Sequence, residues 1–118
     1  MDYSQLSDFE INKRVFKAIV GAIPLGYPHN ADGRSVGNES NGNYRWYDYC
    51  NNPEDAWPII TENKISIMFD STDTRYEGEY HEWCDAISSC QKFGIQHQSN
   101  PLRAAMIVFL MMQDANNA

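Results

Sequence analysis

Two stretches of the chain, one near each end, carry apolar residues with the period of a helix. Ser7-Asp8-Phe9-Glu10 has the spacing of a capping box, and apolar residues then recur at helical spacing from Ile11 to Ile23. Pro24 is expected to end this first helix. Asn100-Pro101 is a favourable helix start, and the residues from Leu102 to Met112 are apolar on nearly every side. Such a helix is expected to lie against a sheet on one side and a partner or another helix on the other.

The middle of the chain predicts strands around one more helix. Asn52 is a suitable N-cap, Pro53 suits the first helical position, and Asn63 is a suitable stop. The run 44–49 before this helix is rich in the aromatic residues that favour strands. After it, partial alternation in the runs 64–69 and 75–83 predicts an antiparallel hairpin.

The remaining segments have no regular pattern. Residues 24–43 crowd together Gly, Pro and Asn, which predicts a long irregular loop, with at most one short strand at 34–36. Within 84–99, residues 86–93 could form a short helix or a loop, and 113–118 form a polar tail. With 118 residues, 42% of them hydrophobic, the chain is predicted to be a single domain spanning residues 1–118. The expected class is α+β, in the order αβαββα.

Charge and hydropathy restrict the partners and the location. The net charge is −7, and the nine Lys and Arg residues are scattered, so the chain would repel a nucleic-acid polymer. The longest apolar run is shorter than the roughly 18–20 residues that span a bilayer, and the first residues do not resemble a signal peptide. A cytoplasmic protein with reduced cysteines and no membrane partner is therefore expected.

Three segments carry a resemblance to a known family. Residues 49–67, which include Asn51-Asn52-Pro53-Glu54-Asp55-Ala56-Trp57, resemble the centre of the NinX-like family of lambdoid phages. Residues 100–110 resemble its C-terminal helix, and residues 4–14 fit its beginning. The resemblance covers a little under half of the chain, and residues 24–43 and 84–99 follow no pattern of the family.

This resemblance implies a phage origin, a location in the cytoplasm of the infected bacterial host, and no established activity. The layout is also similar to the phage ABA-sandwich domain, which implies an antiparallel sheet flanked by helices. A looser resemblance links the chain to phage anti-defence sponges, which bind nucleotide immune signals of the host. Fold analogy alone does not decide among functions.

Catalytic and metal-binding patterns are weak. The Cys and His residues could supply enough ligand atoms for zinc, but no Cys-x-x-Cys pair is present. On a strand, His81 and Cys84 would point to opposite faces, which argues against a cysteine nucleophile. The paired carboxylates occur in polar surroundings, where a raised pKa is not expected. The sequence therefore predicts a non-enzymatic protein with no catalytic residues, no metal and no cofactor.

The combination of aromatic rings and guanidinium groups is the most ligand-like feature. Arg103 interrupts an apolar helix near its start, where Asn100 and free backbone N–H groups could help to bind an anion. Arg103 could instead pair with Glu54, Asp55 or Glu62, and two of the tryptophans could belong to the core. The candidate ligand-binding residues are Arg103, Asn100, Trp83, Trp57, Tyr49, Trp46 and Arg75.

Two functions follow from these residues. The first is a sponge that sequesters a small nucleotide, which requires an unpaired Arg103 facing an enclosed space. The alternative is a protein-interaction factor that inhibits or recruits a host or phage enzyme, with residues 44–49 as its surface. In either case, the apolar C-terminal helix predicts a homo-oligomer.

Overall fold

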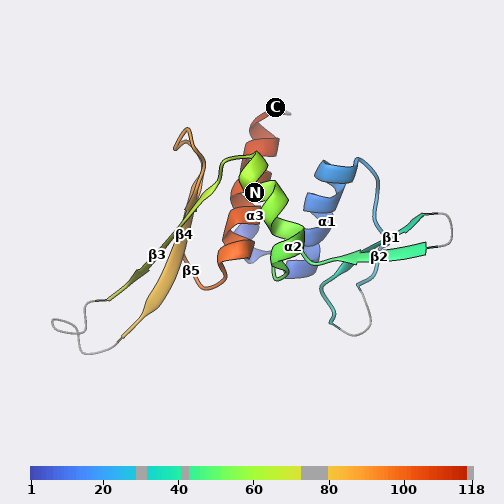
Figure 1. Cartoon of the computed structure of the whole chain (residues 1–118), viewed down its shortest axis with the longest axis horizontal. Helices are drawn as coiled ribbons and strands as arrows, with labels where there is room; N and C mark the ends of the chain where they lie inside the picture. The colour runs from blue at the N-terminus through green and yellow to red at the C-terminus, as the bar shows by residue number, and fades with distance from the viewer. Residues whose placement is uncertain (29–31, 41–42, 73–79, 117–118) are drawn as a thin grey trace.

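The computed structural model describes residues 1–28, 32–40, 43–72 and 80–116. Within these residues the chain is α+β, as predicted, and its elements surround one hydrophobic core (Figure 1). In chain order they are a short 3-10 helix η1 (Tyr3–Gln5), α1 (Asp8–Val20), β1 (Val36–Ser40), β2 (Asn43–Tyr47), α2 (Pro53–Glu62), β3 (Ser66–Ser71), β4 (Glu82–Ile87), β5 (Gly94–Gln98) and α3 (Pro101–Asn116).

The described strands form two antiparallel sheets. β1 pairs with β2, with Val36 opposite Tyr47, and the second sheet has the order β3-β4-β5. An antiparallel hairpin after α2 is confirmed as β3–β4, in which Phe69 lies opposite Cys84, but β4 shares only Glu82 and Trp83 with the expected strand 75–83. The order of elements exceeds the expected αβαββα order by two strands, β1 and β5.

Helix α3 lies in the middle of the molecule. One side of it contacts β4 and β5, and its other side contacts α1 and α2 (Figure 1). Seven consecutive residues, from Ala104 to Leu110, are buried. The predicted position between a sheet and other helices is confirmed, and the chain itself supplies both neighbours. The apolar faces of α3 therefore give no reason for self-association through this helix, and a homo-oligomer stays a prediction.

Capping residues set the helix ends largely as expected. The Ser7 hydroxyl accepts a hydrogen bond from the Glu10 N–H at 3.2 Å, and Asn52 caps α2 through the N–H of Glu54. Asn63 ends α2 as predicted. Helix α1, however, ends before Pro24, because Gly21 adopts the left-handed conformation with φ of 79°.

Several irregular segments of the prediction contain strands. Residues 24–43 include β1, which forms because β2 supplies its hydrogen-bonding partners. Residues 84–99 include most of β4 and all of β5. The chain between these two strands forms turns, so the short helix considered for residues 86–93 is not present. Of the predicted strand 75–83, residues 75–79 lie outside the described residues, and β4 begins at Glu82. The segment 113–118 is helical as far as Asn116.

Candidate functional site

Arg103 does not face an open space. Its guanidinium donates to Asp8 Oδ1 at 2.7 Å and to the backbone carbonyls of Ser4 and Leu6 at 3.2 and 2.6 Å. The expectation that this side chain is unpaired is therefore wrong. The suggested pairing with Glu54, Asp55 or Glu62 is wrong as well, since the carboxylate comes from the start of α1. Arg103 joins the first turn of α3 to the N-terminal segment.

Asn100 is also engaged in holding segments together. Its side-chain oxygen accepts from the Arg103 N–H at 3.1 Å, and its amide donates to Asn51 Oδ1 at 3.0 Å. The Asn51 amide in turn donates to Asp8 and Asp48. The motifs that resemble the phage family thus meet in one polar network between the start of α1, the turn before α2 and the start of α3.

Asn12 lies at the buried end of the same network. It is fully buried, donates to the Arg34 carbonyl at 3.0 Å and to Asp48 Oδ1 at 2.9 Å, and accepts from the Cys50 N–H at 3.1 Å. Arg34 also pairs with Asp48, with 2.6 Å between its Nε and Oδ2. These contacts satisfy buried polar groups and fix the loop before β1 against α1.

The remaining predicted ligand-binding residues lie in separate surroundings. Tyr49 is buried and stacks on Tyr47, with ring centroids 5.7 Å apart. Trp46 lies over Gly37 of the neighbouring strand, so closely that a methyl group at that glycine would overlap its ring. Trp83 stacks on His97 at 4.9 Å. Arg75 lies outside the described residues.

The two buried thiols, Cys50 and Cys84, show no sign of activation for catalysis. Burial raises the pKa of the Cys50 thiol and that of the Cys84 thiol, which disfavours the reactive thiolate. The Cys84 thiol donates to the Gln98 carbonyl at 3.2 Å. Among the described residues, no group of three or more His, Cys, Asp or Glu side chains is placed to hold a metal ion.

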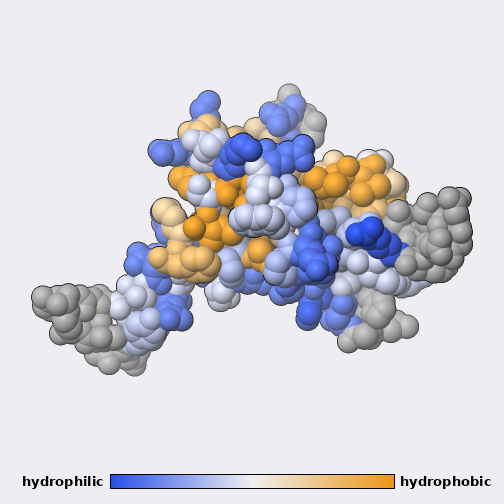
Figure 2. Space-filling view, in the orientation of Figure 1, coloured by the Kyte–Doolittle hydropathy of each residue, from blue (hydrophilic) through white to orange (hydrophobic). Residues whose placement is uncertain are grey.

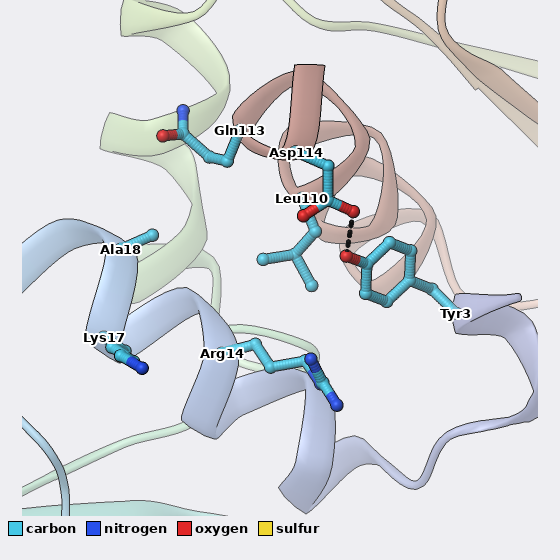
Figure 3. Close-up of a pocket in the computed structure, with 7 residues that line it drawn as sticks. All are labelled: Tyr3, Arg14, Lys17, Ala18, Leu110, Gln113 and Asp114. Atoms are coloured by element: carbon cyan, nitrogen blue, oxygen red, sulfur yellow. Dashed lines mark hydrogen bonds between the residues drawn. The ribbon is translucent and has the colours of Figure 1, made fainter. Parts of the chain in front are cut away.

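A pocket of about 480 Å³ lies between η1, α1 and the end of α3 (Figure 3). Within it, the Tyr3 hydroxyl donates to Asp114, and the Arg14 guanidinium lies 6.0 Å from the centre of the Tyr3 ring. Burial and this hydrogen bond raise the pKa of Tyr3 to about 12. The two cations that line the pocket, Arg14 and Lys17, share it with the Asp114 carboxylate, so its charge is mixed rather than selective for an anion.

An apolar groove of about 760 Å³ lies between α2, β3 and the start of α3. Its α2 wall consists of Trp57, Ile60 and Thr61, which share one face because they are three and four positions apart. We call this depression the Trp57–Phe69 groove. Trp57 is 61% exposed and Phe69 is 75% exposed, which is unusual for such large apolar side chains.

Strand β3 supplies the opposite wall of the groove. Ile67 and Phe69 of β3 are two positions apart and therefore share one face, and Ile65, just before the strand, lines the groove beside them. Leu102, in the first turn of α3, lines the groove between the two walls. Figure 2 shows hydrophobic surface between β3 and α2, with hydrophilic residues around it.

The turn from α2 to β3 fixes the shape of the groove. The Lys64 N–H donates to the Thr61 carbonyl and the Ile65 N–H to the Ile60 carbonyl, at 3.4 and 3.1 Å. This pattern is a Schellman motif, in which the residue at the left-handed position is usually glycine. Here Lys64 occupies that position, with φ of 56°. The motif folds β3 back beside α2 and places Ile60 and Ile65 together at the base of the groove.

Sequence reasoning selected Trp57 but grouped it with Arg103, and it missed Phe69. The alternation of Ile65, Ile67 and Phe69 was visible, yet it indicated only a strand with one apolar face. What the pattern could not show is that α3 covers β4 and β5 more than β3, so the far end of that face stays exposed.

Among the described residues, no helix combines the length and the apolar character needed to cross a membrane.

Comparisons with known proteins bear on the origin of the chain. Searches of curated proteins and of solved structures returned no match, and the looser resemblance to nucleotide sponges gains no support. A family model described as "Bacteriophage P22, NinX" matches residues 2–113. The protein therefore belongs to the bacteriophage P22 NinX family.

Proposed function

We propose that this protein is a non-enzymatic phage accessory factor that acts in the host cytoplasm by binding another protein through the Trp57–Phe69 groove. The observation that carries the proposal is the exposure of Trp57 and Phe69 on either side of an apolar depression. Large exposed apolar surfaces with a polar surround are typical of protein-interaction sites. The interface thus moves from residues 44–49, suggested by the sequence, to α2 and β3.

The chemistry of the groove favours a protein over a nucleotide. Among the described residues that line it, Lys64 is the one charged side chain, and its ammonium group donates to the Thr61 carbonyl at 3.0 Å. A nucleotide phosphate needs several convergent donors, and the side chain that was expected to supply them, Arg103, is bound to Asp8 and two carbonyls. Burial of a partner's apolar side chains in this groove would contribute more binding free energy than binding of a phosphate there.

Affinity capture followed by binding with purified components tests the proposal. Tagged protein is incubated with host lysate, and each captured protein is then purified and titrated against wild type and the double variant Trp57→Ala, Phe69→Ser. Both side chains are exposed, so the variant should fold normally, which its melting temperature checks. We expect the double variant to bind at least roughly tenfold more weakly, because such anchors dominate interface energies.

Tyr27→Ala is the matched control, since Tyr27 is an exposed aromatic residue that does not line the groove. Equal affinity of wild type and the double variant for every captured partner would contradict the proposal. A panel of cyclic dinucleotides, cyclic trinucleotides and cyclic ADP-ribose isomers provides a second arm. A rise in melting temperature with any of them would restore the nucleotide hypothesis.

A further inference from the structure

One edge of the β3-β4-β5 sheet has backbone groups available for pairing. Within the described part of the chain, β3 pairs only with β4, so its other side is an edge. The Thr72 N–H donates to the His81 carbonyl at 2.9 Å, which sets the phase of the ladder. Because antiparallel strands alternate between hydrogen-bonded and non-bonded pairs, Ile67 and Phe69 direct their N–H and C=O groups away from β4.

The same two residues line the groove with their side chains. An extended chain that pairs antiparallel to β3, with residues directly opposite Ile67 and Phe69, would place the side chains of those residues on the same sheet face, because directly opposed residues share a face. Each of those side chains would therefore enter the groove or cover its rim. Backbone pairing and burial of apolar side chains thus reinforce each other at this edge.

The two edges of the sheet differ in their readiness for such pairing. Strand β5 has a register shift against β4 between Cys84 and Ala86, and His97 has a left-handed φ of 56°. Bulges of this kind discourage the addition of another strand. Strand β3 pairs with β4 in continuous register from Ser66 to Ser71. The regular edge is therefore the one beside the groove.

Charge gives the incoming segment a preferred composition. Lys64 precedes β3, and Asp70 lies near its other end, where its carboxylate accepts from the Ser71 N–H at 2.8 Å. A segment with an acidic residue near Lys64 and a basic residue near Asp70 complements both. The net charge of −7 also favours a partner that is basic overall.

We infer that the partner binds as an extended segment that adds a fourth strand to the sheet, pairing with Ile67 and Phe69 and inserting alternate apolar side chains into the Trp57–Phe69 groove. This inference rests on the proposed function and specifies how the partner is recognised. Strand addition of this type derives affinity from main-chain hydrogen bonds and specificity from alternate side chains.

Backbone methylation of a synthetic peptide tests the inference without changing side chains. The probe is a short peptide of alternating valine and threonine with an arginine at its N-terminus and a glutamate at its C-terminus, which is the order that an antiparallel strand beside Asp70 and Lys64 requires. One version carries N-methyl groups on the valines, which would face the groove and hydrogen-bond to β3, and another carries them on the threonines. Binding to the ¹⁵N-labelled full chain is followed by NMR, together with hydrogen exchange of the Ile67 and Phe69 amides.

We expect the unmethylated peptide to bind and to protect both amides. Methylated valines should weaken binding roughly tenfold or more, because each lost hydrogen bond lowers affinity, whereas methylated threonines should have little effect. Equal effects of the two methylated peptides, or no binding at millimolar concentration, would overturn strand addition.

The outcomes also separate this inference from the proposed function. If Trp57→Ala, Phe69→Ser abolishes capture of the natural partner while the position of the methyl groups makes no difference, the groove binds protein but not by strand pairing. If the Ile67 and Phe69 amides become protected as the protein concentration rises without peptide, a second copy occupies the edge, and an added partner strand is ruled out.

Discussion

Removing the guanidinium of Arg103 should destabilise the fold rather than abolish binding of a ligand. Arg103→Ala deletes one ion pair with Asp8 at 2.7 Å and two hydrogen bonds to backbone carbonyls. The side chains of Arg103 and Asp8 are only 16% and 29% exposed, so water replaces these contacts incompletely. Hydrogen bonds to charged groups contribute about 1.5–3 kcal/mol each, but Asp8 keeps its bond to Asn51. We therefore expect Arg103→Ala to lower the free energy of unfolding by about 3 kcal/mol.

Urea unfolding followed by circular dichroism measures this loss as a change in midpoint at constant slope. Arg103→Lys keeps the charge beside Asp8 but cannot hold three acceptors in one fork, so it should recover about half of the stability. Lys92→Ala, at an exposed cation, serves as the control and should change stability by less than about 0.5 kcal/mol. A loss below about 1 kcal/mol for Arg103→Ala, with an unchanged slope, would refute a structural role for this residue.

Four further predictions concern single residues. Asn12→Ala should lower the unfolding free energy by about 3 kcal/mol in urea titrations, because this fully buried side chain loses three hydrogen bonds. Gly37→Ala should lower it by about 1–3 kcal/mol by forcing aside an indole ring, whereas Gly26→Ala, in open space, should not. Lys64→Gly should raise the melting temperature, because glycine adopts the left-handed conformation without the steric cost that lysine has there, a net gain of about 0.5 kcal/mol in unfolding free energy. Cys90 is exposed, and a hydrogen bond with a serine lowers its pKa, so mass spectrometry should find it alkylated first by iodoacetamide, with a rate that levels off at lower pH than for a free thiol.

Local signals in the sequence predicted helices better than strands. Ser7, Asn52 and Asn100 each cap a helix through contacts within a few residues, and these starts are all confirmed. Strand β1 was not predicted as such because its stability depends on a partner strand, and Gly37 within it normally indicates a loop. That glycine is required by the Trp46 ring, a neighbour that only the folded register brings close.

The site was predicted less well than the fold, for a related reason. Arg103 in an apolar helix looked like an anion-binding group, and its actual partner, Asp8, is 95 positions away in sequence. No local pattern reports such a contact. In the same way, Phe69 is exposed because α3 packs mainly on β4 and β5 and contacts β3 less. The sequence showed only that Phe69 shares a face with Ile67.

The central position of α3 has a consequence for synthesis of the protein in the infected cell. Translation produces α1, α2 and the β3-β4-β5 sheet before it produces α3, the helix against which they pack. Until Pro101–Asn116 has left the ribosome, the nascent chain has no complete core and exposes residues such as Phe16 and Ile60 to chaperones and proteases. A product released before α3 is made should therefore be degraded rather than accumulate as a partly active fragment.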